Sequence, residues 1–384
     1  MKNIFTYFLV FLILLESVAL GYFFYQYQTE TEEEQVFVEE KPKYKNIILM
    51  IGDGMGYEHL LTADAYQESL GENLFMLESP YQNFVRTFPE TTTITDSAAS
   101  ATTMATGFKS TTGEISQTPE GVELKTILEI AQENEMSTGL VSTKFINDAT
   151  PAAFAAHEIS RRNYQAIFED MFLVSKPDVV IGGIPKGVEL SDYQLGDYEM
   201  INDLELIQTD KKIAGFFDFA MLEMTDGGTS GEYSGEQSEG QIGERLSLAN
   251  ITDYSLNRLA ENEEGFFLMV EGAKIDTESH KNDIARLIYE MEDFDNAVKT
   301  AYEFANSRED TILIVTADHE TGGLVMREGF DTDGYPNVEW EGKSHTGRYV
   351  PLLSWQEMDG LVDGEVIDNT QIHYLMKNIL LDIS

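Results

Sequence analysis

Three apolar runs of this 384-residue sequence end in side chains that can bind a metal ion. These side chains are Asp53 after the run 46–51, Glu271 and Asp276 after the run 265–270, and Asp318 and His319 after the run 311–316. Each run has the length and composition of a strand buried on both faces of a parallel sheet. Since open α/β sheets bind ligands beyond the carboxyl ends of their strands, we expect these side chains to converge. Converging carboxylates repel one another, so the pattern predicts divalent cations among them.

Two further histidines extend the predicted metal centre. Asp276 and His280 are four residues apart, which puts both on one face of a helical turn. His345 lies in the polar, turn-like segment 344–347. The chain has no Cys, which excludes thiolate ligands, disulfides and a Cys nucleophile. Imidazole with carboxylate suits a Zn²⁺ that water can reach. Any one of these residues alone is more simply a helix cap or loop residue, but the set favours a metal site.

The segment 95–102 (TDSAASAT) contains a candidate nucleophile, Ser97. A small-residue helix that opens at Ser97 would present the hydroxyl beside backbone N–H groups that favour an anion. Taken alone, the segment is only an N-capped helix that packs closely. No base adjoins Ser97 in the sequence, so a metal would have to activate its hydroxyl.

The segment 147–162 has a third set of polar residues. Pro151 at the first position of a helix would make Thr150 its N-cap. Arg161 follows Thr150 by eleven residues, about three helical turns, so the two could share a face. An Arg in an acidic pocket suits bidentate binding of phosphate. Otherwise Arg161 is a surface ion pair.

Together these segments resemble the alkaline phosphatase family. The matching stretches occur in the family's order and cover most of the chain: 45–56, 95–102, 148–161, 271–280, 316–323 and 344–347. The resemblance implies that Ser97 forms a phosphoserine intermediate and that Arg161 clamps the phosphate. Thr277 stands at a position that varies in the family and can carry a basic or aromatic side chain. A smaller Thr would leave the phosphate more open to water.

The resemblance also implies two Zn²⁺ and one Mg²⁺. The ligands would be Asp276, His280 and His345 for one Zn²⁺, Asp53, Asp318 and His319 for the second, and Asp53, Thr150 and Glu271 for Mg²⁺. Asp148, two residues before Thr150, is placed to accept hydrogen bonds from waters around Mg²⁺. The alternative is that Asp148 only caps the helix opening at Pro151. Some family members have His at this position, which would shift the preference towards Zn²⁺.

The implied function is hydrolysis of phosphate monoesters with a broad substrate range, as in phosphate scavenging. The alternatives are a phosphodiesterase or sulfatase on the same core, and a non-catalytic exported binder of metal or phosphate. Thr150, Glu271 and Arg161 favour monoesters over the phosphodiesterase and sulfatase alternatives, and a non-catalytic binder would require a lost nucleophile or metal ligand, whereas every such position is intact. A sulfatase would need a Cys or modified-Ser signature, which the segment 95–99 lacks. Small phosphate monoesters are the expected partners, and a homodimer is left open.

Alternating strand and helix patterns predict the fold. Strand-like runs at 138–142 and 179–183 alternate with helical patterns at 124–133, 164–174 and 287–301. We expect a doubly wound, mostly parallel α/β sheet with helices on both faces, in one catalytic domain over 45–384. A small cap insertion is expected at about 327–344. The Gly/Ser/Glu-rich stretch 225–245 is expected to be a surface loop.

Composition and the N-terminus bear on location and partners. The net charge, 25 basic minus 68 acidic residues, is −43, which argues against nucleic acid as a partner. Hydrophobic residues make up 42%, enough for a sizeable core.

Residues 1–24 contain an apolar run of signal-peptide length and could instead be an uncleaved membrane anchor of 4–24. Residues 25–44 are predicted to be an acidic linker. We therefore expect export to the cell envelope or exterior.

Overall fold

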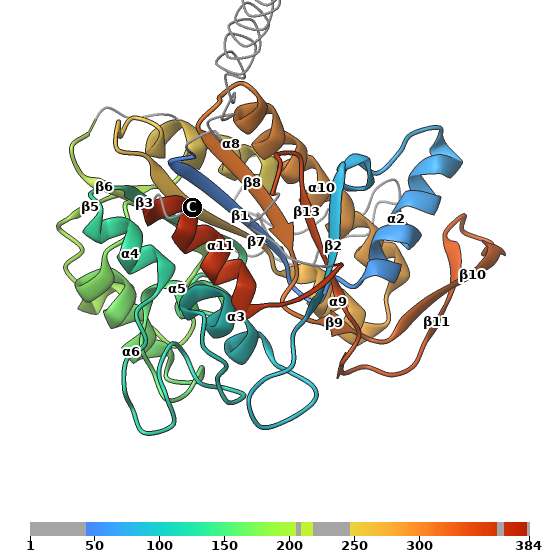
Figure 1. Cartoon of the computed structure of the whole chain (residues 1–384), viewed down its shortest axis with the longest axis horizontal. Helices are drawn as coiled ribbons and strands as arrows, with labels where there is room; N and C mark the ends of the chain where they lie inside the picture. Colours follow the sequence, from blue (N-terminus) through green and yellow to red (C-terminus); the bar gives the residue numbers. More distant parts are fainter. Residues whose placement is uncertain (1–43, 205–208, 218–245, 359–364, 382–384) are drawn as a thin grey trace, which may run out of the picture. The chain divides into compact units, whose positions relative to one another are not determined.

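The computed structural model describes residues 44–204, 209–217, 246–358 and 365–381. In these ranges the chain forms a large sheet covered by helices (Figure 1). The expected surface loop 225–245, the N-terminal segment 1–24 and all of the linker except Tyr44 lie outside the described residues. Among the described helices, none combines the length and apolar composition that a membrane crossing requires.

The main sheet has ten strands and is mostly parallel, as predicted. Their order across the sheet is β14 (Val366–Asp368), β2 (Tyr81–Arg86), β13 (Val350–Ser354), β8 (Thr311–Thr316), β1 (Asn46–Gly52), β7 (Phe266–Gly272), β3 (Ser137–Phe145), β4 (Val179–Gly183), β6 (Lys212–Phe217) and β5 (Tyr198–Ile201). Strand β13 is antiparallel to both neighbours, and the other neighbouring pairs are parallel. Every residue of β8, β1 and β7 is buried, which explains their continuous apolar runs.

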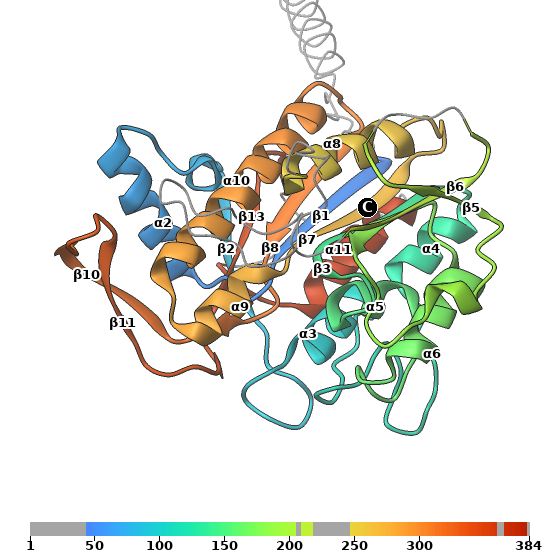
Figure 2. The ribbon, with the colours of Figure 1, turned by 180° about the vertical axis from the view of Figure 1, so that it is seen from behind.

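Helices cover both faces of this sheet (Figures 1 and 2). One layer contains α8 (Leu248–Leu259) and α10 (Ile284–Asn306), and the opposite layer contains α3 (Ser97–Thr106), α4 (Ile127–Glu133), α5 (Ala149–Ala155) and α11 (Thr370–Leu381). The remaining described helices are α2 (Tyr57–Leu70), α6 (Tyr164–Glu169), which continues as a π-helical turn over Asp170–Ser175, α9 (Lys274–Lys281) and the short 3₁₀ turns Phe75–Glu78 and Leu190–Asp192. The predicted apolar face of α10 is buried against the sheet from Leu287 to Ala301.

The start of α5 differs from the expected one. The helix begins at Ala149, so Asp148 is the N-cap residue and Pro151 is the third helical residue. This is tolerated because backbone N–H groups of the first turn have no partner within the helix. The helix ends at Ala155, since Ala156 is extended. The expectation that Thr150 and Arg161 share one helix face is therefore wrong, and Arg161 lies in the turn that follows.

A hairpin of β10 (Leu324–Phe330) and β11 (Pro336–Trp340) accounts for most of the segment 327–344. It packs against α2 and projects at one end of the molecule (Figure 1). Two aromatic contacts hold it there, a stacked pair of Tyr66 and Tyr335 and an edge contact between His59 and Trp340.

Candidate metal centre

Strand register brings the acidic strand ends together. Ile51 of β1 pairs with Glu271 of β7 on one side and with Thr316 of β8 on the other. Glu271 is also level with Ser142 of β3. Because all four strands are parallel, the residues that follow them emerge at one edge of the sheet. A slip of one residue in any pair would turn a carboxylate to the opposite face.

Four of the predicted ligands form an inner cluster, which consists of Asp53, Glu271, Asp318 and His319 and is at most 2% exposed. His319 Nε2 lies 3.2 Å from Asp318 Oδ2 and 3.6 Å from Asp53 Oδ1. Backbone N–H groups of Gly54 and His319 donate to the other oxygen of Asp318 at 3.0 and 2.9 Å. Ser142 Oγ donates to Glu271 Oε2 at 2.5 Å. Strand ends and the turns beside them therefore fix the inner side chains.

The remaining three predicted Zn²⁺ ligands form an outer cluster, which consists of Asp276, His280 and His345. Asp276 Oδ1 lies 3.2 Å from His280 Nε2 and 3.6 Å from His345 Nε2. Ligand atoms of all three lie within 4.8 Å of one another. Ligand atoms of Asp276, Asp53 and His319 also lie within 4.8 Å of one another, so Asp276 lies between the two clusters. His345 arrives through the two-residue strand β12 (His345–Thr346), which pairs with β9 (Glu320–Thr321).

Hydrogen bonds set the same tautomer in the two outer histidines. His280 Nδ1 lies 2.5 Å from the carbonyl of Lys343, and His345 Nδ1 lies 2.9 Å from the carbonyl of Thr95. A carbonyl oxygen can only accept, so Nδ1 of each ring carries the proton. In the neutral form of each ring, Nε2 then carries a lone pair on the side of Asp276. This is the usual arrangement of a metal-binding histidine.

Thr321 sets the tautomer of the inner histidine, His319, in the same way. Thr321 Oγ1 donates to Asp276 Oδ1 at 2.6 Å, which uses its only proton. The same hydroxyl lies 3.2 Å from His319 Nδ1 and therefore accepts a hydrogen bond from it. The lone pair on His319 Nε2 then faces the carboxylates of Asp53 and Asp318.

The chemistry of the inner cluster fits a bound cation. Within the described residues, Asp53 Oδ1, Asp318 Oδ2 and Thr150 Oγ1 are buried and have no hydrogen-bond partner. Such atoms are rare in proteins unless an ion or water satisfies them. Burial, and then neighbouring carboxylates, raise the pKa of Asp53 well above its usual value. Burial likewise raises the pKa of Asp318 to about 6 and that of Glu271 to about 7. These oxygens suit divalent cations, which would remove the mutual repulsion.

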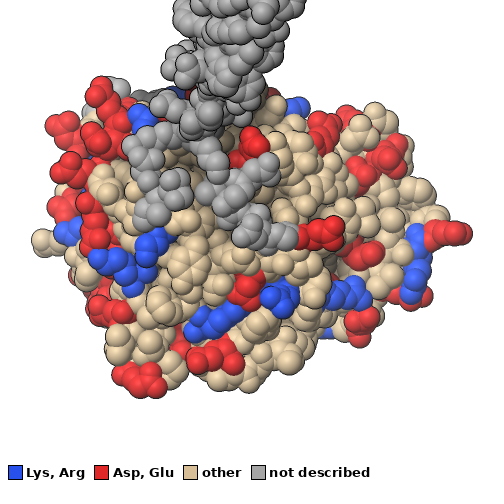
Figure 3. Space-filling view, in the orientation of Figure 1, with Lys and Arg blue, Asp and Glu red and all other residues tan. Residues whose placement is uncertain are grey.

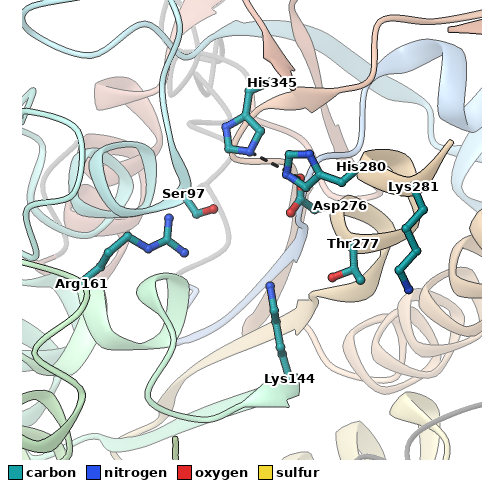
Figure 4. Close-up of a pocket in the computed structure, with 8 residues that line it drawn as sticks. All are labelled: Ser97, Lys144, Arg161, Asp276, Thr277, His280, Lys281 and His345. Atoms are coloured by element: carbon teal, nitrogen blue, oxygen red, sulfur yellow. Dashed lines mark ion pairs between the residues drawn. The ribbon is translucent and has the colours of Figure 1, made fainter. Parts of the chain in front are cut away.

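Ser97 lies between the inner cluster and a neighbouring cavity. Asp96 caps α3 and accepts from the backbone N–H of Ala99 at 3.1 Å, so the helix opens at Ser97 as predicted. Ser97 Oγ lies 3.2 Å from His319 Nε2. The cavity measures about 450 Å³ and is lined by Ser97, Lys144, Arg161, Asp276, Thr277, His280, Lys281 and His345 (Figure 4).

Two carboxylates hold Arg161 in the cavity wall. Its Nη1 lies 3.2 Å from Asp96 Oδ2, and its Nη2 lies 3.2 Å from Asp148 Oδ1. Figure 4 shows the guanidinium pointing towards Ser97. Although Asp148 is the N-cap residue of α5, its side chain makes no capping hydrogen bond. The alternative that Asp148 only caps this helix is therefore wrong, because its carboxylate binds Arg161 and Lys144.

Three contacts in the site were not singled out from the sequence. Lys144 forms an ion pair with Asp148, Asp96 forms one with Arg161, and Thr321 orients His319. The ion pair of Lys144 could have been predicted, because Lys144 comes four residues before Asp148 near the end of a predicted strand. Thr321 and Asp96 lie inside the quoted motifs, but their partners come from distant parts of the chain.

Comparison with known proteins identifies the family of this chain. The sequence model of the family described as alkaline phosphatase matches residues 44–176 and 199–335. The chain is 34% identical over 301 residues to alkaline phosphatase 3 of Bacillus subtilis, a match that covers 73% of this chain and 62% of the relative. It is 29% identical over 412 residues to alkaline phosphatase of Escherichia coli, which covers 89% of this chain and 87% of the relative.

Solved structures show the same fold. Alkaline phosphatase from the Antarctic bacterium TAB5 superposes with a TM-score of 0.74 at 25% identity, covering 89% of this chain and 99% of that one. A variant of the TAB5 enzyme has Mg bound in its M3 site. The chain therefore belongs to the alkaline phosphatase family, a family of metal-dependent hydrolases. It spans a little under two thirds of the length of the two Bacillus subtilis relatives.

Proposed function

We propose that this protein hydrolyses phosphate monoesters to an alcohol and inorganic phosphate through a phosphoserine at Ser97. The observation that carries the proposal is the position of the Ser97 hydroxyl. It opens helix α3, lies 3.2 Å from His319 Nε2 and shares a cavity with Arg161. A nucleophile, a metal-binding cluster and a phosphate-binding cation therefore surround one cavity, as phosphoryl transfer requires.

The residues present fit three cations. We assign one Zn²⁺ to the outer cluster, one Zn²⁺ to Asp53, Asp318 and His319, and Mg²⁺ to Asp53, Thr150 and Glu271. The unpartnered oxygens of Asp53, Asp318 and Thr150 support this assignment. Nitrogen ligands favour Zn²⁺, whereas an all-oxygen set favours Mg²⁺. When bound, such ions lower the pKa of hydroxyl groups and neutralise charge that develops during phosphoryl transfer.

The chain's own residues position the reaction. Arg161, held by Asp96 and Asp148, donates two parallel hydrogen bonds to two phosphate oxygens. Ser97 Oγ attacks phosphorus, and the bond from phosphorus to the alcohol oxygen breaks as the alcohol leaves with a proton. Water then attacks the phosphoserine, which releases inorganic phosphate and restores the hydroxyl. The N-terminus of α3 adds a field that favours the anion throughout.

We further propose a broad substrate range. The residues assigned to the reaction would contact only the phosphate and its metals, and Thr277, which also lines the cavity, is a small side chain that takes up little of that space. Recognition of the alcohol would therefore contribute little. The apolar N-terminal sequence supports export, where scavenging phosphate from many esters would be useful.

The experiment is hydrolysis of chromogenic esters by the purified chain. We expect turnover of p-nitrophenyl phosphate, loss of turnover with a chelator, and recovery when Zn²⁺ and Mg²⁺ are both restored. Bis-p-nitrophenyl phosphate and p-nitrophenyl sulfate serve as matched comparison substrates. A preference for either one would instead favour the diesterase or sulfatase alternative, and no turnover of any ester in the metal-loaded protein would contradict an enzymatic function.

A further inference from the structure

Lys144 is a cation in the cavity wall to which the proposed function assigns no role. It lies near the end of β3, and its ammonium points into the cavity that Ser97 and Arg161 also line (Figure 4). Its side chain is only 24% exposed. Desolvation makes a charge in this position costly, so its presence calls for an anionic partner.

One such partner is Asp148. Lys144 Nζ lies 3.2 Å from Asp148 Oδ2, while the other carboxylate oxygen faces Arg161. A single carboxylate thus bridges two cations on the same side of the cavity. An ammonium has three N–H donors, and within the described residues Asp148 is the only carboxylate in ion-pair range of Nζ. Donors remain for a ligand in the cavity.

Lys144 keeps its positive charge despite its burial. Burial alone would lower its pKa, but the negative charges of Asp148, Asp53 and Asp276 outweigh burial and raise it above the usual value. Lys144 therefore stays protonated in neutral and moderately alkaline solution, and can bind an anion across that range.

The part of the cavity wall formed by α9 provides a comparison. Thr277 is uncharged, and Lys281 binds Glu278 at 2.8 Å with a side chain that is 52% exposed. An exposed cation is screened by water and salt, whereas a half-buried one acts on its neighbours with less screening. Of the two lysines that line this cavity, Lys144 is therefore the one placed to hold a bound anion.

We infer that Lys144 is a second phosphate-binding residue, which donates to a phosphoryl oxygen that Arg161 leaves free. This inference rests on the proposed function and adds a reason for the enzyme to prefer monoesters over diesters. A monoester dianion has three non-bridging oxygens and two charges, whereas a diester has two such oxygens and one charge. A second cation therefore favours monoesters and also retains inorganic phosphate as product.

The test compares Lys144→Gln with the matched control Lys281→Gln. Binding of inorganic phosphate is measured by calorimetry on metal-loaded protein, and kcat/KM is measured for p-nitrophenyl phosphate and its methyl diester. We expect Lys144→Gln to weaken phosphate binding about 10-fold to 100-fold, the usual range for a hydrogen bond to a charged group. The monoester-to-diester ratio should fall by about tenfold, and Lys144→Arg should recover part of both. Lys281→Gln should stay within about twofold of wild type.

Two results would overturn the inference. One is unchanged phosphate affinity and an unchanged ratio in folded, metal-replete Lys144→Gln. The other is an equal loss for both esters with loss of bound Mg²⁺, which would mean that Lys144 only supports Asp148. If the wild type turns over neither ester but binds phosphate in a way that depends on Lys144, the proposed function fails and the inference stands.

Discussion

The inner and outer clusters have different origins in the chain. The inner residues follow the ends of neighbouring parallel strands and are almost completely buried. The outer residues come from α9 and from the short strand β12, and the side chains of His280 and His345 are 39% and 18% exposed. Sheet register therefore determines the inner geometry, whereas the packing of surface segments determines the outer geometry. Asp276 belongs to both groups of potential ligand atoms, and the stacked rings of His319 and His345 bring the two clusters into contact.

The largest expected effect is that of Ser97→Ala, because Ser97 lies in the cavity that both clusters border. Monoester hydrolysis should fall by roughly a thousandfold or more, since the covalent route is lost. Ser97 is not among the proposed metal ligands, so metal content and melting temperature should stay close to wild type. Steady-state kinetics with metal analysis checks this. Near-normal turnover in the variant would show that the two clusters do not converge on this hydroxyl.

The second prediction separates the clusters directly. Asp318→Asn removes a buried inner ligand, and His345→Ala removes a partly exposed outer one. Both variants should lose zinc, but excess Zn²⁺ should restore activity partly in His345→Ala and hardly at all in Asp318→Asn. The physical reason is that water can replace a ligand at the exposed site, whereas the buried site has no access to it. If excess Zn²⁺ restored activity equally in both variants, the proposed difference between the buried inner site and the more exposed outer site would be wrong.

The same contrast explains how much the sequence could predict. Asp53, Glu271 and Asp318 were found as a group because continuous apolar runs mark buried parallel strands, and such strands end at one edge. No local pattern joins His345 to Asp276, because their contact depends on the pairing of β12 with β9 beyond a hairpin. That contact was expected only from the family resemblance.

Local helix signals were less reliable than strand signals. Pro151 suggested a helix start that is two residues too late, since proline fits several positions of a first turn. Arg161 reaches the cavity from a turn rather than from a helix, and one of the two carboxylates that hold it, Asp96, is 65 residues away in the sequence. Thr126, in contrast, forms a capping box with Glu129, so α4 begins after it rather than at residue 124.

The third prediction concerns Asp148, which lies beside the inner cluster but bonds to cations of the cavity wall. Burial opposes its ionisation, but Lys144 and Arg161 together hold the pKa of Asp148 below its usual value. Wild type should need added Mg²⁺ for full activity, and Asp148→His should need less because it offers nitrogen near the ion. A Mg²⁺ titration of both proteins at fixed Zn²⁺ measures this, and superimposable activation curves would contradict it.

The smallest expected effect lies outside both clusters, at His157. His157 Nε2 lies 3.2 Å from Glu129 Oε1. Burial opposes the charged ring, but the hydrogen bonds to Glu129 and to the carbonyl of Ser116, together with nearby negative charge, outweigh burial and raise the pKa of His157. Because its pKa is higher in the folded state, the contribution is fully present below the unfolded value of about 6.5 and is lost as pH rises through the folded pKa. His157→Gln should therefore lower the free energy of unfolding by about 0.5–1 kcal/mol at pH 6 and less at pH 9. Urea unfolding at the two pH values checks this. An equal loss of unfolding free energy at both pH values would show that the substitution acts through packing rather than through the charge on His157.

In the proposed reaction, Ser97 accepts the phosphoryl group at the meeting point of the two clusters. The direct measurement is to mix metal-loaded protein with labelled inorganic phosphate or a monoester, quench in acid and locate the label by peptide mass spectrometry. We expect one phosphorylated peptide, modified at Ser97, that is absent from Ser97→Ala and from chelated wild type. Active turnover with no phosphoserine trapped, or a label on a different residue, would contradict it.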